Sequence, residues 1–423
     1  MKKYYSRLIE KEIDRKLKSS GAVVIVGPKF CGKTTTAMLF QKSMIRLNTK
    51  QIIQIVSMNP TPYLEGDKPR LIDEWQTVPD IWNSIKNNLD LDYEFGKFIL
   101  TGSSTPADKE DIYHSGAGRI TPIKMKTMSL FESNESKGLV SLSKLFDESK
   151  INTFDLNNDF TLEEAAYLIC RGGWPISLQD DKELGLEIMY NYYNSLFIFE
   201  YSDNEKFRDL KPETLKTILA SYARNISTEA SISSMLRDLE IRDNFKIDRD
   251  TLEKYIEALN DLYIIEDVNA WNPNIRSKTS IRTTPTRHFV DTSIACRALN
   301  ISPDDLVNDL NTMGLFFEDL AVRDLKIYAN TFGGEVRHYR DNAGLECDAV
   351  IHLPNGKWGA IEIKLGGEKA IDDAAKSLKL LKNKIINKSN EQEPSFMMIL
   401  TAVGSLYQRD DGIIVVPINC LKH

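Results

Sequence analysis

Short apolar runs alternate with polar or helical segments along the first third of the chain. Four such runs occupy residues 22–27, 52–57, 70–75 and 97–103. Runs of this length, alternating with helical segments, are typical of a parallel sheet covered on both faces. Residues 4–18 place apolar side chains at helical spacing and predict an amphipathic leading helix. Residues 119–133 predict a further strand, so the first region is expected to be an α/β domain.

The middle and the end of the chain have different patterns. After residue 161 the apolar spacing is mostly helical, and the turn-rich residues 269–291 follow, which suggests a winged-helix unit. Beyond residue 300 the pattern predicts a helix, two strands at 345–353 and 358–365, a Lys-rich helix and a final strand pair. We therefore expect three domains, at residues 1–160, 161–298 and 299–423.

The composition is that of a soluble globular protein and limits the partners. The chain has 423 residues, of which 42% are hydrophobic and 27% charged, as expected for two to three folded domains. Its net charge of -7 argues against binding nucleic acid over the whole surface, although a local basic face can still exist. The five cysteines lie far apart, as in proteins with reduced thiols, and no apolar run is long enough to span a bilayer. The charged N-terminus lacks the apolar core of a signal peptide, so we expect a cytoplasmic protein without a membrane partner.

A glycine-bounded loop follows the first apolar run. Residues 27–34, GPKFCGKT, match G-x-x-x-x-G-K-[ST] at every fixed position. Glycines let backbone N–H groups close around phosphate oxygens, and the start of the next helix adds positive potential. Lys33 is placed to reach the β- and γ-phosphates, and the Thr34 hydroxyl to ligate Mg²⁺. We expect ATP and Mg²⁺ here, bound by Gly27, Pro28, Lys29, Phe30, Cys31, Gly32, Lys33, Thr34 and Thr35.

An acidic pair lies at the end of the run at residues 70–75. Asp73 is expected near the Mg²⁺ ion, and Glu74 near the water that attacks the γ-phosphate, where it would act as general base. Acidic dipeptides are common at strand ends. The glycine loop upstream is what favours the catalytic interpretation.

Two further positions are candidates for contacting the γ-phosphate. The run that begins at residue 97 leads to the hydroxyls of Thr101, Ser103 and Ser104, which could sense the phosphate or form an ordinary strand-end turn. Arg119 follows two glycines and is a candidate arginine finger, acting in its own subunit or in a neighbouring subunit of a homo-oligomer. A plain surface arginine is the alternative.

These motifs together resemble a known family. GPKFCGKTTTA, LIDEWQ, FILTGSS and GAGRI, followed by MSLFES, look like the prokaryotic AAA-type ATPases that carry a C-terminal domain of unknown function. RGGWP, DLYIIEDV and RHFVDTSIA are similar to later landmarks of that family, so the resemblance covers almost the whole chain. It implies an α/β fold with a RecA/AAA-like P-loop NTPase sheet. Trp75 stands where the family usually has an aliphatic residue, which does not affect the chemistry.

Carboxylates and a lysine alternate on the two strands expected near the C-terminus. Asp348 shares one strand face with Val350, and Glu362 shares one face with Lys364. If the strands form a hairpin, the charged groups converge, and Asp348 and Glu362 could hold a metal ion while Lys364 steadies the transition state. Glu318 on the preceding helix could join them. The spacing resembles the PD-(D/E)xK nuclease core, to which the family's C-terminal domain is similar; a half-exposed strand with solvated charges is the alternative.

The segment expected to form the wing is basic. No acidic residue lies between Asp267 and Asp291, and the segment contains Arg276, Lys278, Arg282 and Arg287. These cations could contact DNA phosphates without sequence specificity, or could lie in a solvated loop or a domain contact. Trp174 is expected to be a buried turn anchor, whereas Trp271 could be buried or could stack on bases.

The features favour one function and leave one alternative. The favoured interpretation is a Mg²⁺-dependent ATPase whose P-loop domain is coupled through a winged-helix unit to a nuclease-like α/β domain, with DNA as an expected partner. The alternative is an ATP-controlled binding or switch module. Its nuclease-like domain would be catalytically inactive and would dock DNA or a protein.

Overall fold

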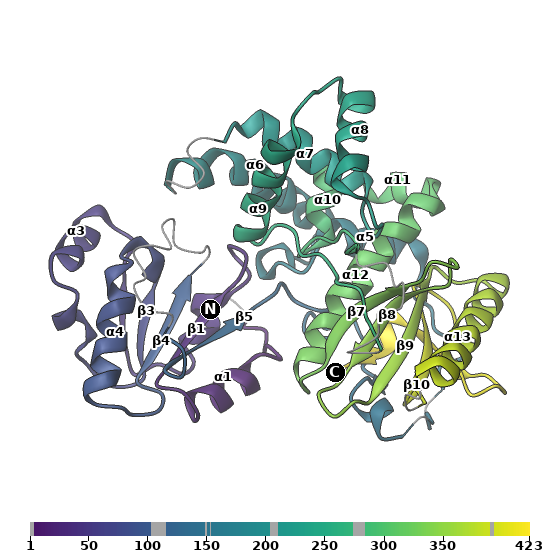
Figure 1. Cartoon of the computed structure of the whole chain (residues 1–423), viewed down its shortest axis with the longest axis horizontal. Coiled ribbons are helices and arrows are strands. Elements are labelled where there is room, and N and C mark those ends of the chain that lie inside the picture. The colour runs from purple at the N-terminus through teal and green to yellow at the C-terminus, as the bar shows by residue number, and fades with distance from the viewer. Residues whose placement is uncertain are drawn as a thin grey trace. The chain divides into compact units, whose positions relative to one another are not determined.

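The computed structural model describes residues 4–102, 116–148, 150–152, 154–203, 210–273, 284–389 and 393–423. Its contacts divide the chain into two compact units (Figure 1). The first unit comprises Met1–Thr127, Ser195–Pro212 and Glu257–Ile264, and the second comprises the remaining residues. Among the described residues, no helix is long and apolar enough to cross a membrane. The division into three domains stays a prediction.

The first unit is built on a five-stranded parallel sheet. Its strands are β1 (Ala22–Val26), β2 (Ser43–Arg46), β3 (Arg70–Asp73), β4 (Phe98–Gly102) and β5 (Ile120–Lys124). They stand in the order β2-β3-β4-β1-β5, and every neighbouring pair is parallel. All carboxyl ends of the strands therefore lie at one edge of the sheet, where ligands bind in open α/β sheets.

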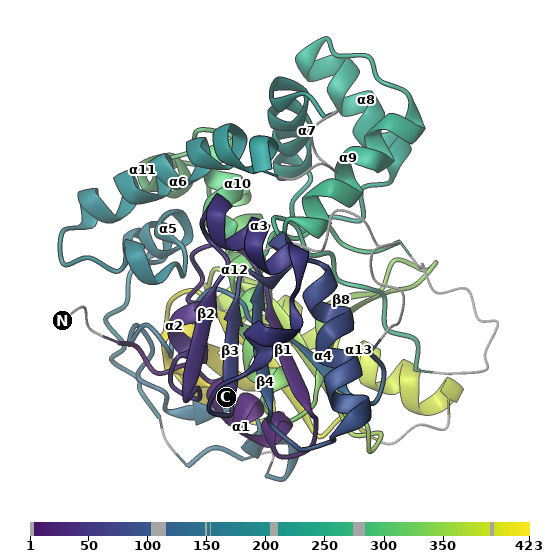
Figure 2. The same cartoon turned by 90° about the vertical axis from the view of Figure 1, so that its left-hand side faces the viewer.

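Helices cover both faces of this sheet. They are α1 (Glu10–Leu17), α2 (Lys33–Ala37), α3 (Lys50–Met58) and α4 (Asp80–Leu91), with short 3₁₀ turns at Thr61–Leu64 and Trp75–Thr77. In Figure 2, α3 and α4 lie in front of the strands. Their apolar side chains share a core with the strand residues that point the same way, including Val24, Ile72 and Leu100. Burial on both faces explains why these strands appear in the sequence as continuous apolar runs.

The strand expected at residues 52–57 is wrong, because these residues lie in helix α3. The Thr49 side chain caps this helix by accepting a hydrogen bond from the N–H of Ile52. Ile52, Ile53 and Val56 then recur at helical spacing and pack on the core. The strand in this part of the sheet is β2, which is short and only partly buried. The leading helix also begins later than expected, at Glu10.

The middle of the chain is helical, as expected. The helices are α5 (Leu162–Arg171), α6 (Lys182–Asp203), α7 (Pro212–Arg224), α8 (Ile232–Asp243), α9 (Arg249–Asp261), α10 (Thr292–Ala298) and α11 (Pro303–Asn308). After α9, isolated antiparallel bridges join Ile265 to Phe289 and Val268 to Thr286. A buried Trp174 follows α5 and donates its ring N–H to the Ser293 hydroxyl at 3.1 Å, so the expected turn anchor is confirmed.

A six-stranded mixed sheet forms the C-terminal part of the second unit. Its order is β11 (Tyr407–Gln408), β12 (Ile414–Pro417), β10 (Phe396–Thr401), β9 (Trp358–Lys364), β8 (Glu346–His352) and β7 (Glu335–Arg340). Helices α12 (Leu310–Asn330) and α13 (Glu368–Ser389) lie on opposite faces (Figure 1). The antiparallel β8–β9 hairpin is confirmed. A small parallel pair, β6 (Val140–Ser141) with β13 (Leu421–Lys422), and 3₁₀ turns at Lys144–Phe146, Pro175–Ser177 and Ile418–Cys420 complete the unit.

A buried arginine joins distant segments of the second unit. The Arg323 guanidinium pairs with Asp291 at 3.0 Å and with Asp324 at 2.8 Å, and all three side chains are buried. Asp291 also accepts the N–H of Gly173, and Asp324 accepts the N–H of Leu130. One cation thus holds α12, α10, the loop after α5 and the chain near residue 130 together.

We expect Arg323→Met to destabilise this unit by roughly 3–5 kcal/mol, because it leaves two buried carboxylates without their cation. Urea unfolding followed by tryptophan fluorescence would measure the change. Arg337→Met is the control, because Arg337 pairs with the more exposed Glu335. That exposed pair is expected to contribute less than about 1 kcal/mol. Equal small losses in both variants would contradict the account of the buried cluster.

Candidate functional site

The glycine loop leaves the carboxyl end of β1 and turns into α2. Gly27 has φ 147°, and a Cβ atom there would overlap the carbonyl oxygen of Met125. Gly32, just before α2, has φ 103°. Both positions lie in the left-handed region that favours glycine, which is the physical reason for the two fixed glycines of the motif. Cys31, between them, is buried, whereas the Phe30 side chain is 65% exposed.

The Lys33 side chain folds back over the loop. It is buried, and its Nζ donates to the carbonyl oxygens of Gly27 at 2.8 Å and Pro28 at 2.7 Å. These bonds hold the ammonium inside the loop, close to where a bound phosphate chain would need it. Because α2 has only five residues, its dipole is short, and the loop N–H groups must supply most of the anion binding.

Asp73 brings the loop helix and two strand ends together. Its Oδ1 accepts the hydroxyl of Thr34 at 2.7 Å and that of Thr101 at 2.5 Å. The Arg46 guanidinium lies 3.7 Å from the other oxygen. Asp73 itself is buried. The structure therefore places the two residues predicted to hold Mg²⁺, Thr34 and Asp73, in direct contact at the carboxyl edge of the sheet.

Glu74 has an uncommon backbone conformation. Its φ and ψ are 60° and 42°, in the left-handed region, and it begins the 3₁₀ turn that follows β3. The Gln76 side chain donates to Glu74 Oε2 at 2.5 Å. A non-glycine residue in this region is strained by roughly 1–3 kcal/mol, and such strain is often found at functional sites. Glu74 is thus held beside Asp73 by a turn, but its role as general base stays a prediction.

The other residues predicted to contact the γ-phosphate do not all lie at the carboxyl edge of the sheet. Thr101 reaches Asp73, as described, whereas Ser103 and Ser104 lie outside the described residues. Arg119 lies at the opposite edge, because its backbone carbonyl accepts the N–H of Ala22 at the start of β1. Its side chain pairs with Asp90. An arginine finger in its own subunit is therefore excluded by geometry, and a role in a neighbouring subunit stays a prediction.

Arg46 was missed by the sequence interpretation. It ends β2 and is in register with Asp73 on β3. The strand was expected at residues 52–57, which hid the fact that Arg46 lies at the carboxyl edge. Placing the strand on the apolar residues before Thr49 would have revealed it.

In the second unit, the predicted charged residues of the hairpin converge. Lys364 Nζ lies 2.8 Å from Asp348 Oδ2 and 2.8 Å from Glu362 Oε2. Asp348 Oδ2 also accepts the N–H of Ile363 at 2.7 Å. The hydroxyl of Ser377 on α13 donates to the other oxygen of Glu362 at 3.2 Å. We call Asp348, Glu362 and Lys364 the hairpin triad.

Burial changes the protonation of this group. Burial and the charge of Asp348 raise the pKa of Glu362 to about 8. The same two causes raise the pKa of Glu318 on α12 well above its usual value. Burial alone would lower the pKa of the Lys364 ammonium, but Asp348 and Glu362 hold it above its ordinary value. Lys364 therefore stays charged and balances the charge of Asp348, whereas Glu362, with a pKa of about 8, is largely protonated at neutral pH.

The hairpin triad does not fit a divalent metal ion as it stands. The Lys364 ammonium lies between the carboxylates predicted to ligate the metal, and it bonds to both of them. Hard cations need several oxygen ligands around the ion. Among the described residues, no group of three or more His, Cys, Asp or Glu side chains could hold a metal ion. A metal ion could enter only if Lys364 moved away.

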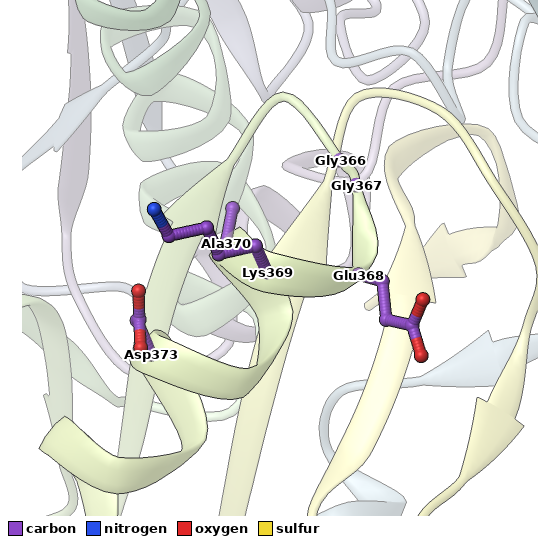
Figure 3. Close-up of a pocket in the computed structure, with 6 residues that line it drawn as sticks. All are labelled: Gly366, Gly367, Glu368, Lys369, Ala370 and Asp373. Carbon is purple, nitrogen blue, oxygen red and sulfur yellow. The ribbon is translucent and has the colours of Figure 1, made fainter.

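A shallow pocket lies just beyond the hairpin triad in the sequence. It has a volume of about 480 Å³ and is lined by Gly366, Gly367, Glu368, Lys369, Ala370 and Asp373. Figure 3 shows the side chains of Glu368, Lys369 and Asp373 spread over the first two turns of α13. Two of the three charged residues in this lining are acidic, and the hairpin triad is not part of it. The pocket therefore gives no support for a phosphate site at the triad.

The predicted basic wing is only partly described. Arg276, Lys278 and Arg282 lie outside the described residues. Arg287 is buried, and it donates to Asp267 Oδ2 at 2.5 Å and to the carbonyl oxygen of Ala230 at 2.9 Å. Of the alternatives left open for Arg287, these bonds fit an internal packing contact and not a contact with DNA phosphates. Trp271 is also buried, with its ring 4.9 Å from that of Trp358, so it is a core residue.

Family models match three successive parts of the chain. An AAA domain model matches residues 19–134, a Domain of unknown function (DUF8612) matches residues 162–305, and a Domain of unknown function (DUF4143) matches residues 313–421. The first match covers the sheet with the glycine loop and Asp73. This part of the chain is therefore similar to AAA domains. The description of the family that matches the C-terminal region names no activity.

Similar proteins add little about function. The chain is 22% identical over 369 residues to an uncharacterized protein of Mycobacterium tuberculosis, Rv2008c, and equally to Mb2031c of Mycobacterium bovis; the alignment covers 86% of this chain and 74% of each relative. The Walker-type ATPase PABY2304 of Pyrococcus abyssi is 13% identical, with a TM-score of 0.42 over 68% of this chain and 94% of that one. A RuvB variant of Thermotoga maritima is 12% identical, with a TM-score of 0.24 over 61% and 88%. At these TM-scores neither structure defines the fold of this chain.

We expect Lys364→Met to destabilise the second unit by roughly 1–3 kcal/mol. This is less than the loss expected for a fully buried ion pair, because the Lys364 side chain is partly exposed. In the absence of nucleotide, Mn²⁺ should raise the melting temperature of this variant, because the freed carboxylates can then accept a cation. It should not raise that of the wild type. Lys376→Met, which removes a lysine from an exposed pair with Asp373 on α13, is the control. A wild-type protein stabilised by Mn²⁺ as strongly as Lys364→Met would refute the closed triad.

Proposed function

We propose that the N-terminal domain binds ATP with Mg²⁺ and hydrolyses it. The observation that carries the proposal is the contact of Asp73 with Thr34 and Thr101 at the mouth of the glycine loop. A site for a nucleotide and its metal ion needs an anion-binding loop, a metal-binding hydroxyl and an acid beside that hydroxyl. In this chain these groups belong to different segments of the sequence. Their convergence at one edge supports a working site rather than a chance motif. We call the carboxyl ends of β1, β3 and β4, with the glycine loop, the nucleotide edge.

The residues present fit a magnesium ion. Mg²⁺ binds through few protein oxygens and is completed by phosphate and water, so a hydroxyl and a neighbouring carboxylate are sufficient. Thr34 would bind the metal ion directly. Asp73, which accepts the Thr34 hydroxyl, would hold that ligand in place beside the ion. When bound, Mg²⁺ neutralises charge that develops on the phosphates.

Lys33 and Glu74 have separate tasks in this proposal. Lys33 would exchange its two carbonyl partners for phosphate oxygens, which keeps its buried charge paired throughout. Glu74 would accept a hydrogen bond from the attacking water and orient it toward the γ-phosphate. Its bond from Gln76 supports this role, because the amide holds one carboxylate oxygen in place.

For the C-terminal domain we propose a binding role controlled by the nucleotide domain, without cleavage. The supporting observation is Lys364, whose ammonium occupies the position between Asp348 and Glu362. A metal-dependent nuclease is the second candidate, because the triad converges as in the PD-(D/E)xK core. DNA, a protein and a second copy of the chain are the partners that fit these two candidates.

We expect Lys33→Ala to abolish nucleotide binding, since it removes the cation inside the loop. Glu74→Gln should bind ATP with wild-type affinity but should lower kcat by about 100-fold or more, because the amide cannot accept a proton from water. Equilibrium binding and phosphate release would measure both effects. Glu65→Gln, an exposed residue beyond the far end of β3, is the control. Unchanged turnover in Glu74→Gln would remove Glu74 from the mechanism.

We expect the protein to leave plasmid and single-stranded DNA intact in the presence of Mg²⁺ or Mn²⁺, with or without ATP. Gel electrophoresis after prolonged incubation checks this. Cleavage by the wild type that Asp348→Ala loses would instead establish the nuclease. Cleavage that survives Asp348→Ala would not come from the hairpin triad.

A further inference from the structure

Arg7 is a buried cation of the nucleotide domain, and it lies just ahead of α1. Its side chain contacts two separate segments. Nη1 donates to the carbonyl oxygen of Cys31 in the glycine loop at 2.7 Å. Nη2 donates to the carbonyl oxygens of Lys126 at 2.8 Å and Thr127 at 3.1 Å. Arg7 is only 5% exposed, so these bonds are protected from water.

The bond to Cys31 fixes the orientation of one peptide group. In a trans peptide, the carbonyl of one residue and the N–H of the next point in opposite directions. The guanidinium on the Cys31 carbonyl therefore turns the N–H of Gly32 to the opposite side. Gly32 is the second fixed glycine of the motif, and N–H groups of this loop are the phosphate ligands. Arg7 thus holds a donor in position before any nucleotide arrives.

The bonds to Lys126 and Thr127 join the loop to the chain that leaves β5. Other contacts support the same junction. The N–H of Met125 donates to the Val26 carbonyl at 2.8 Å. The Cys31 thiol lies 3.8 Å from the Met125 carbonyl oxygen, which also approaches Gly27 too closely for any side chain there. Residues 125–127 and the glycine loop are therefore packed as one piece, and the chain continues directly into the second unit.

A second residue of the same segment reaches the loop helix. The Tyr4 hydroxyl lies 2.8 Å from Glu10 Oε1 and 3.4 Å from the Thr36 hydroxyl on α2. Residues 4–7 thus contact the nucleotide loop and its helix at two points.

We propose that Arg7 is a positioning residue for the nucleotide and the link between the glycine loop and residues 125–127. It orients the Cys31–Gly32 peptide for phosphate binding. Because it also holds residues 126 and 127, it couples nucleotide binding in the glycine loop to the conformation of the chain that leaves β5. The inference rests on the proposed ATP site. Arg7 lies before the first strand and outside the motifs around the glycine loop, yet it sets the affinity for nucleotide and links nucleotide binding to residues 125–127.

The test uses the full chain with Arg7→Met and Arg7→Lys. Arg70→Met is the matched control, because Arg70 belongs to the same domain and donates to the Tyr63 carbonyl oxygen at 2.7 Å and the Ser43 hydroxyl at 3.0 Å. Affinity is measured with a fluorescent ADP derivative. Amide hydrogen exchange of residues 125–135 is measured with and without Mg²⁺-ADP.

We expect Arg7→Met to weaken ADP binding by about tenfold or more, because a charged hydrogen bond that orients a phosphate donor is lost. It should also abolish the protection of residues 125–135 that nucleotide induces in the wild type. Arg7→Lys should be intermediate, since an ammonium keeps the charge but cannot bridge both segments. Arg70→Met should retain wild-type affinity and protection.

Wild-type affinity together with wild-type protection in Arg7→Met would overturn the inference. If Arg7→Met fails to fold, as judged by circular dichroism, Arg7→Lys decides in its place, and a wild-type response there would overturn the inference too. A wild-type protein that binds no nucleotide would refute the ATP site itself. Normal binding by the wild type, with the same affinity and protection in Arg7→Met, would refute the role of Arg7 alone.

Discussion

The carboxylate of Asp73 joins the parts of the nucleotide edge. It is buried, and it receives hydroxyl hydrogen bonds from Thr34 on the loop helix and from Thr101 at the end of β4. A buried charge of this kind is stable only when donors surround it. The parallel order of the sheet supplies them, because β1, β3 and β4 all end at the same edge. Fold and site are thus linked through one acidic side chain.

The two units treat buried charge differently. At the nucleotide edge, Asp73 has hydroxyl partners that a metal ion can share. In the hairpin triad, the Lys364 ammonium already contacts both Asp348 and Glu362 and offsets the charge between them. A similar use of an internal cation occurs at Arg323, which holds Asp291 and Asp324. This contrast is the structural reason for proposing turnover in the first unit and binding in the second.

Local sequence patterns predicted much of the architecture and of the site. The glycine loop, Asp73 and the β8–β9 hairpin were all recognisable, because each depends on spacing within a short segment. The strand prediction at residues 52–57 is wrong because a short apolar run fits either a strand or one face of a helix. The cap at Thr49 and the packing of these residues in the core with Ile72 of β3 distinguish the helix from the strand. The positions of Arg119 and Arg287 depend on tertiary partners, Asp90 and Asp267, that lie far away in the sequence. Arg7 belongs to no motif, and its contacts are visible only in the folded chain.

The most direct test of the account is the Mg²⁺ dependence of ATP binding in the wild type and in Asp73→Asn. Isothermal titration calorimetry with and without Mg²⁺ measures it. The account predicts that Mg²⁺ strengthens ATP binding markedly in the wild type and has little effect in Asp73→Asn, where the carboxylate charge is gone. An equal gain from Mg²⁺ in both proteins would show that Asp73 does not organise the metal, and would contradict the account at its centre.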